Sequence, residues 1–319
     1  MLPIAEAQLT SVWALPGYGP AQIIASGQGF PLGIAVGSDG SVYWANQHPF
    51  GSGQIVKLAP GTTSPTVLVS GLSYALGVGV DAAGNVYYDE YMQGSLYELP
   101  VGSSTPKILA TGLNYPNFIS VDTAGDVYMI TGQTCGNTIV EYSAKTGIVS
   151  TIMTYPQLDG IFIHPSGDLY FAICSSNPLQ IGLLTKGSST PQIVYTGSQQ
   201  NSQWYNWVAG VAVDATRNIF FTIYALSVQV LPQGANMPQV LATSSQDGYG
   251  HQLAVDLKDD IFFTDSYAGN IWKIPANTTP VPEFPSSSAL IVVLVTFAII
   301  AVLDVGYTKK RKRATICGS

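Results

Sequence analysis

The residues of this sequence best suited to chemistry are oxygen-bearing side chains that occur at two positions of a repeated pattern, before its first strand and at the end of its second strand. Carboxylates occur there as Glu90, Asp159 and Asp265, and amides occur as Asn46 and Asn117. Oxygen ligands of these types bind divalent cations, and Ca²⁺ takes about six to eight of them. The same side chains also hydrogen-bond the backbone at strand ends, so a purely structural role is the alternative.

The histidines offer a second kind of chemistry, because imidazole transfers protons near neutral pH. None of His48, His164 and His251 lies near a serine or cysteine in a nucleophile motif. We expect His164 to be structural, since it replaces an aspartate in a turn. His251 starts the last copy of the repeat, and together with Glu90 it is the candidate for proton transfer if the protein is an enzyme.

Six copies of a repeat must position these side chains. They open at Pro31, Ala75, Pro116, Leu158, Val208 and His251. Their turn positions lie 44, 41, 42, 50 and 42 residues apart, at Gly37, Asp81, Asp122, His164, Asp214 and Asp256. This period is typical of the blades of a β-propeller and not of helical solenoids.

Each copy predicts four strands. An alternating apolar strand is followed by a D-x-x-G turn, a V-Y-aromatic strand and two outer strands joined by a Pro/Gly/Ser/Thr hairpin. The last copy lacks a fourth strand, and Gln22–Ala25 matches it. We therefore predict an all-β, six-bladed propeller over residues 20–275 that is closed by this N-terminal strand. Val12–Leu15 resembles a third strand, so closure by two strands from each end is the alternative.

The motif GLxxPxGIAVDxxGNVYxxD resembles the NHL repeat and the wider family of six-bladed propellers that includes gluconolactonase-like enzymes. The resemblance implies the fold but leaves the function open, since this scaffold carries hydrolases, lyases, sensors and binding modules. Gluconolactonase-like enzymes place an Asn and an Asp of consecutive blades on a divalent metal, and Asn117 and Asp159 match those positions. The Glu and the further Asn of that family have no counterpart here, where the blade entrances carry Leu32, Leu76, Ala209 and Gln252.

The starts of the first strands and the ends of the second strands share one rim around the central channel of such a propeller. We expect the binding rim to comprise Asn46, Glu90, Trp204, Tyr205, Trp207, His251 and Asp265. Aromatic rings among amides suit stacking on sugars or packing against a protein. The alternative is that Trp204 and Trp207 fill the channel mouth.

Two of the three cysteines follow second strands of neighbouring blades. Cys135 and Cys174 would therefore lie on the same rim within bridging range, and a disulfide there fits an oxidising exterior. Cys317 follows a basic cluster near the C-terminus. The three cysteines have no metal-ligand spacing, which argues against a zinc site.

The C-terminal region predicts a membrane anchor. Residues 276–287 form a Pro/Ser/Thr-rich stalk, and residues 288–307 contain the apolar run ALIVVLVTFAIIAVL, which is long enough for a transmembrane helix. The tail 308–319 carries five basic residues at 309–313. Such a cluster stays in the cytoplasm, so we expect a single-pass membrane protein with an extracellular propeller.

The segment VPEFP from Val281 to Pro285, followed by the helix and the basic cluster, resembles the sorting tail of archaeal surface proteins. The resemblance implies cell-surface attachment. Residues 1–19 form an N-terminal segment in which Met1–Gln8 lacks the features of a signal peptide. Either the true start lies upstream, which the basic tail favours, or the protein is tail-anchored with a cytosolic propeller.

The net charge of −7 with only 10% charged residues argues against nucleic-acid binding, which needs a basic stripe. We therefore expect a surface-anchored binding module that recognises a glycan, a peptide or an envelope protein at the rim. The alternative is an extracellular lactonase or lyase that depends on Ca²⁺ or another divalent cation at Asn117 and Asp159.

Overall fold

The computed structural model describes residues 9–10, 17–47, 52–133, 135–174, 178–197, 208–223, 227–244 and 250–276. The chain divides into two units, Met1–Ala276 and Asn277–Ser319, and the described residues belong to the first. These residues contain no helix that could cross a membrane. The predicted transmembrane segment 288–307 and basic tail 308–319, and the stalk beyond Ala276, lie outside the described residues.

Strand pairing groups the first unit into antiparallel sheets of four, five and seven strands, which divide into four-stranded blades. Blade 1 comprises β3 (Pro31–Val36), β4 (Val42–Asn46), β5 (Gly53–Leu58) and β6 (Thr66–Leu72). Blade 2 comprises β7 (Val78–Val80), β8 (Val86–Glu90), β9 (Ser95–Leu99) and β10 (Lys107–Ala110). Blade 3 comprises β11 (Pro116–Val121), β12 (Val127–Thr131), β13 (Gly136–Ser143) and the first part of β14 (Ile148–Ile163).

The 16-residue strand β14 continues from blade 3 into blade 4, so these blades form one seven-stranded sheet. Blade 4 adds β15 (Leu169–Ile173), β16 (Gln180–Leu184) and β17 (Gln192–Thr196). Blade 5 comprises β18 (Val208–Val213), β19 (Ile219–Ile223), β20 (Ser227–Leu231) and β21 (Gln239–Ser244). Blade 6 comprises β22 (Gly250–Val255), β23 (Ile261–Asp265), β24 (Asn270–Ile274) and β2 (Gln22–Ala25).

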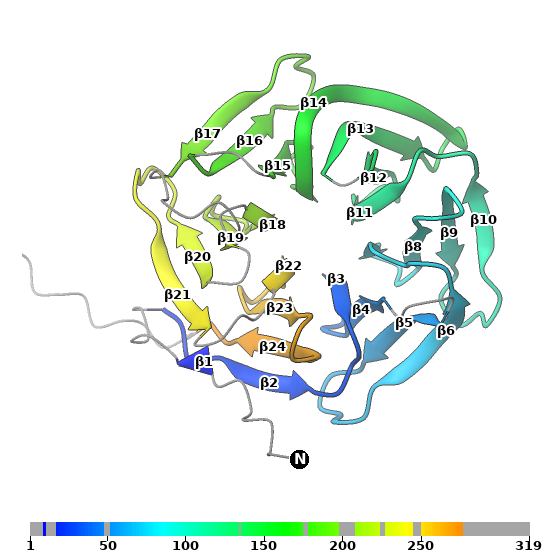
Figure 1. Cartoon of the computed structure of the whole chain (residues 1–319), viewed down its shortest axis with the longest axis horizontal. Helices are drawn as coiled ribbons and strands as arrows, with labels where there is room; N and C mark the ends of the chain where they lie inside the picture. Colours follow the sequence, from blue (N-terminus) through cyan, green and yellow to red (C-terminus); the bar gives the residue numbers. More distant parts are fainter. Residues whose placement is uncertain are drawn as a thin grey trace, which may run out of the picture. The chain divides into compact units, whose positions relative to one another are not determined.

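The innermost strands form a closed circle. Each contacts the next in the order β3, β7, β11, β14, β18 and β22, and β22 contacts β3 again. Figure 1 shows the blades arranged around this centre, with the outermost strands on the periphery. The prediction of an all-β propeller made of four-stranded antiparallel sheets is confirmed.

The last blade combines strands from both ends of the repeat region. β2 pairs antiparallel with β24, with Gln22 opposite Lys273. Blade 6 thus takes three strands from its own copy and one from the N-terminal side. β1 (Leu9–Thr10) pairs with the outer strand β21 of blade 5, while Val12–Leu15 lies outside the described residues.

The turns between first and second strands follow from the D-x-x-G pattern. The Asp81 carboxylate accepts hydrogen bonds from the backbone N–H groups of Ala83 (3.0 Å) and Asn85 (2.8 Å). Arg217 and Asp259 replace the glycine in the last two copies, yet they adopt φ values of 67° and 64° and make the same turn. The structure therefore gives these two turns the geometry of the others.

Aromatic side chains fill the seams between blades. Tyr43 of blade 1 packs in one cluster with Val86 and Tyr88 of blade 2, and Phe220 of blade 5 packs with Phe263 of blade 6. Burial of one such ring stabilises the fold by about 1.5–3 kcal/mol. The seams therefore hold the rim in place.

Candidate functional site

A repeated β-bulge forms the mouth of the central channel. In five blades the first strand shifts register against the second, between the pairs Pro31/Ile34, Asn117/Ile119, Leu158/Ile161, Val208/Gly210 and Gly250/Leu253. Bulges redirect side chains and are frequent beside active sites. Of the blade entrances that the sequence places on one rim, all except Leu76 lie in these bulges.

Neighbouring bulges touch through their backbones. The N–H of Gly33 donates to the carbonyl of Leu76 at 2.9 Å, and a Cβ at Gly33 would lie 2.5 Å from that oxygen. At Gly160 a Cβ would lie 2.7 Å from the carbonyl oxygen of Ala209. Glycine is therefore required at these positions, because a side chain would separate adjacent blades at the mouth.

Blade 3 departs from this pattern beside the predicted metal ligand. Phe118 stands where the bulges of blades 1, 4 and 5 have glycine, adopts a φ of 42° and packs against the core of blades 3 and 4. Asn117, the residue before it, is 5% exposed, and its Oδ1 has no hydrogen-bond partner among the described residues. A buried carbonyl oxygen without a donor costs about 1–3 kcal/mol. It is suited to accept a cation or a donor group from a ligand.

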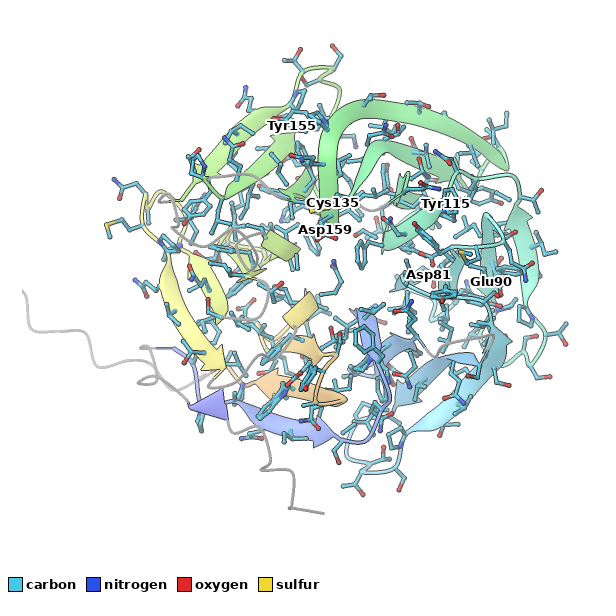
Figure 2. All side chains as sticks on the ribbon, in the orientation of Figure 1. Asp81, Glu90, Tyr115, Cys135, Tyr155 and Asp159 are labelled. Atoms are coloured by element: carbon cyan, nitrogen blue, oxygen red, sulfur yellow. A yellow bond between two sulfur atoms is a disulfide. The ribbon has the colours of Figure 1, made fainter. Side chains whose placement is uncertain are left out.

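Asp159 occupies the bulge of the next blade and is half-buried. Figure 2 places it at the inner side of the ring near Cys135. The predicted neighbourhood of Asn117 and Asp159 thus corresponds to consecutive bulges of strands β11 and β14, which contact each other.

The structure gives two second-strand carboxylates local backbone partners. Glu90 is buried and accepts a hydrogen bond from the N–H of Ser73 at 2.8 Å. Asp265 is also buried and accepts from the N–H of Ala268 at 3.0 Å, and burial raises its pKa. Both side chains therefore fix the backbone of nearby loops on the rim, at Ser73 and at Ala268. Asn46 is buried at the same position of blade 1, and its Oδ1 has no partner within the described part of the chain.

Asp89 is a fully buried carboxylate that the sequence analysis did not single out. It accepts hydrogen bonds from the N–H groups of Leu76 and Gly77, both at 3.0 Å. Burial raises its pKa to about 8, against the lowering effect of these two donors. Thr222 and Thr264 occupy the equivalent position of the second strand in blades 5 and 6. Their Oγ1 atoms accept hydrogen bonds from the N–H groups of Gly210 (2.9 Å) and Gln252 (3.3 Å), so the side chains at this position support the bulges. The sequence feature that could have revealed Asp89 is a polar residue at a strand position that is apolar in other copies of the repeat.

A group of tyrosines on the same rim was also missed. Tyr91 and Tyr115 lie on blades 2 and 3 with ring centroids 5.0 Å apart, and Tyr91 donates its N–H to the carbonyl of Tyr74. Tyr74 and Tyr115 have φ values of 58° and 48°, a strained conformation for residues other than glycine. Among the described residues the three phenolic oxygens make no hydrogen bond. The sequence feature that could have revealed this group is a tyrosine directly before a copy of the repeat, as at Tyr74 and Tyr115.

Other predicted rim residues are only partly placed. The backbone of His251 lies in β22, next to Gln252, whose Nε2 donates to the carbonyl of Ala209 at 2.8 Å. The side chain of His251, and all of Trp204, Tyr205 and Trp207, lie outside the described residues. Cys135 and Cys174 form a disulfide between blades 3 and 4, with Cα atoms 5.9 Å apart.

The side-chain oxygen atoms at the mouth suit a cation that takes only a few of its ligands from the protein. No group of three or more His, Cys, Asp or Glu side chains in the described ranges is arranged to hold a metal. Asn117 and Asp159 supply two oxygens in neighbouring bulges. Mg²⁺ keeps several waters and uses only one or two protein carboxylates, whereas Ca²⁺ needs a fuller shell. The residues thus suit a water-rich divalent site better than a Ca²⁺ cage.

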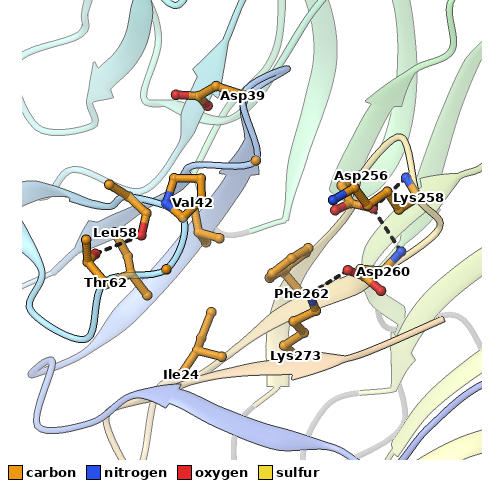
Figure 3. A pocket seen from close by; sticks show the side chains of 14 residues that line it. Ile24, Asp39, Val42, Leu58, Thr62, Asp256, Lys258, Asp260, Phe262 and Lys273 are labelled. Atoms are coloured by element: carbon orange, nitrogen blue, oxygen red, sulfur yellow. Dashed lines mark hydrogen bonds and ion pairs between the residues drawn. The ribbon is translucent and has the colours of Figure 1, made fainter. Parts of the chain in front are cut away.

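Two other cavities are less suited to chemistry. A groove of about 270 Å³ lies at the seam of blades 6 and 1 (Figure 3), where Lys273 pairs with Asp260 and Asp256 accepts from the N–H of Lys258. Its charges are thus already compensated. The channel itself encloses about 120 Å³ and is lined mainly by aliphatic side chains. It provides an apolar wall below the mouth.

Solved structures with a similar fold belong to enzymes and to a protein complex. A gluconolactonase from Xanthomonas campestris has 13% sequence identity and a TM-score of 0.65, over 85% of this chain and 95% of that chain. A catalytically inactive virginiamycin B lyase from Staphylococcus aureus, solved with quinupristin, has 14% identity and a TM-score of 0.58, over 80% of this chain and 98% of that chain. A nidogen/laminin complex has 16% identity and a TM-score of 0.56, over 67% of this chain and 83% of that chain.

At these identities the likeness establishes the fold alone. No protein-family model matches the sequence, and no curated protein matches it. Function must therefore be argued from the rim.

Proposed function

We propose that the channel mouth is the active site of an enzyme of the lactonase or lyase kind that acts on a small molecule with the help of a divalent cation. The observation that carries this proposal is the buried Oδ1 of Asn117, which has no donor in the part of the chain that the structure describes and lies in the bulge beside that of Asp159. The fold shared with a gluconolactonase and a virginiamycin B lyase supports the same class of function.

The roles follow from the position of each residue. Asn117 and Asp159 would hold the cation, which would polarise a carbonyl or carboxyl oxygen of the substrate. His251, at the start of β22 on the same mouth, is the residue that we propose to move the proton. Glu90 is the second candidate for that role, although the N–H of Ser73 already orients its carboxylate. The aliphatic channel lowers the polarity around the reacting groups.

Cation binding is the direct test of this proposal. Millimolar Mg²⁺ or Ca²⁺ should raise the melting temperature, because a ligand that binds only the native state adds about 2.7 kcal/mol at 100 times its Kd. Asp159→Asn should remove the shift, whereas Asp122→Asn, in a turn at the far end of β11, should retain it. An unchanged melting temperature of the wild-type protein in about 10 mM Mg²⁺ would count against the site.

A binding module is the second candidate, and the paired rings of Tyr91 and Tyr115 favour it. Aromatic faces with unpaired hydroxyl groups suit stacking on a glycan, with a peptide or an envelope protein as alternative partners. Tyr91→Ala and Tyr115→Ala should then weaken capture of immobilised glycans, as should changes at Trp204 and Trp207. Ile148→Ala is the control, since that side chain is 62% exposed at the start of β14, on the outer edge of blade 3. Equal capture by all variants would contradict this function.

We further propose that residues 288–307 anchor the propeller to the cell membrane, with the tail 308–319 in the cytoplasm and the propeller outside. The apolar run and the basic cluster support this topology, and the VPEFP segment favours an archaeal surface. A membrane-impermeant thiol reagent should label Cys317 only after the cells are permeabilised. Labelling of intact cells would contradict the orientation.

A further inference from the structure

The disulfide spans strand β14 immediately before Asp159. Leu158 of β14 pairs on one side with Gly136 of β13 and on the other with Ile173 of β15. Cys135 directly precedes Gly136, and Cys174 directly follows Ile173. The bridge therefore joins the two strands that flank β14, at the residue next to the candidate ligand.

A second contact ties the bridge to the same segment. The N–H of Cys174 donates to the carbonyl of Gln157 at 2.6 Å. Gln157 and Cys135 both adopt left-handed conformations, with φ values of 61° and 55°. Residues other than glycine keep this conformation only when their surroundings impose it. The cross-link is one such restraint.

The ladder of β14 is weakest where the bridge lies. Register shifts occur between Gly136 and Thr138 on the β13 side, and between Leu158 and Ile161 on the β15 side. The segment in which β14 turns from outer to inner strand therefore has few regular backbone pairs. A covalent restraint matters most in such a place.

We propose that the Cys135–Cys174 disulfide is a redox-sensitive strap that holds Asp159 in position, so that reduction loosens the candidate cation site while the propeller stays folded. The effect on cation affinity rests on the function proposed above, whereas the effect on the backbone does not. A dithiol would supply two electrons and two protons. The S–S bond would break, both cysteines would become thiols, and the dithiol would be oxidised to its disulfide.

The remaining pairs of β14 should keep the ring closed after reduction. Ile139 still pairs with Met153 on the outer part, and Ile163 still pairs with Leu169 on the inner part. Leu158 and Phe171 remain in the buried core of blades 3 and 4. The loosening is therefore confined to the segment around Gln157–Gly160.

Amide hydrogen exchange on the full chain in detergent tests the strap. Reduction by tris(2-carboxyethyl)phosphine, with thiols counted by mass spectrometry, should speed exchange at 157–161 by about tenfold or more. Amides of β8 in blade 2 should not change. Cys135→Ser/Cys174→Ser should exchange like the reduced protein and ignore the reductant, while Cys317→Ser should behave like wild type. Unchanged exchange at 157–161 in fully reduced protein would overturn the proposal.

Cation affinity separates this inference from the proposed function. If the site binds Mg²⁺, reduction should raise its Kd about fivefold or more, in line with coupling energies of linked sites. Faster exchange with no Mg²⁺ binding in either redox state would support the strap and reject the cation site. Equal Kd values in both states would reject the positioning of Asp159 by the strap.

Discussion

Arg217 of blade 5 reaches across the seam to Asp168 of blade 4, and its Nη2 lies 2.9 Å from Oδ2 of the aspartate. Its Nη1 also donates to the hydroxyl of Tyr170 at 3.3 Å. Arg217 stands at a turn position that glycine holds in the first four copies, and it keeps a φ of 67°. The turn thus accepts backbone strain at the residue that links two blades.

Arg217→Ala should destabilise the protein more than Arg217→Gly. Both changes remove an ion pair whose arginine is 40% exposed, which is worth about 1 kcal/mol or less. Only glycine also relieves the left-handed strain, which costs about 1–2 kcal/mol. Urea denaturation should therefore rank wild type and Gly above Ala. If Ala and Gly have equal midpoints, the turn is not strained.

Stability should fall as the pH rises from about 4 to 8 because of Asp89. Burial raises the pKa of this carboxyl to about 8, whereas in the unfolded chain it is about 3.9. Between these values the folded state keeps a proton that the unfolded state has lost, so the free energy of unfolding falls by up to about 1.4 kcal/mol per pH unit. The effect is complete above pH 8.

Asp89→Asn should flatten this dependence, since an amide does not titrate, and its single carbonyl oxygen can still accept from one of the N–H groups of Leu76 and Gly77. Denaturation curves at pH 5, 6, 7 and 8 would measure the slope. Asp122→Asn, with no buried carboxylate removed, is the control and should keep the wild-type slope. Identical slopes for Asp89→Asn and wild type would refute the assignment.

Gly160→Ala should be costly because the new Cβ would meet the backbone of blade 5 at 2.7 Å. Overpacking of this kind costs about 1–3 kcal/mol or more. Gly61→Ala adds only left-handed strain, since nothing lies within 4 Å of its Cβ, and should cost about 1 kcal/mol. Thermal denaturation of the two variants would compare them. A smaller loss at Gly160 would mean that neighbouring bulges separate easily.

Replacing both Cys135 and Cys174 by serine should lower the free energy of unfolding by about 4 kcal/mol, the loop-entropy value for a cross-link of this span. The two residues are 39 positions apart. Denaturant unfolding under oxidising conditions, and again with reductant, would give the difference. The variant should match the reduced wild type, and a loss under about 1 kcal/mol would indicate that the native state is strained by the bridge.

The repeat allowed the strands to be predicted, because each D-x-x-G turn lies between two apolar runs. It also indicated that Gln22–Ala25 completes the last blade, and β2 pairs with β24 there. The bulges at the mouth could not be predicted, since a register shift leaves no mark in an alternating pattern. The absence of a donor to Oδ1 of Asn117 among the described residues likewise depends on which residues are its neighbours in three dimensions.

The continuous strand β14 was also missed. Pro156 lies within it, and proline is normally confined to edges and bulges of sheets. The repeat predicted blades 3 and 4 as separate copies and did not indicate a continuous strand between them. Asp89, Thr222 and Thr264 were also not predicted as functional, although these polar side chains inside strands hold the backbone of the blade entrances.

The shared strand β14 also limits how the number of blades can change during evolution. Between blades 1 and 2 and between blades 2 and 3 a described loop joins one blade to the next, and an additional copy of the repeat could enter there without disturbing an existing strand. Between blades 3 and 4 an inserted copy would interrupt the backbone of both sheets. Homologues with more or fewer repeats should therefore gain or lose them elsewhere in the circle.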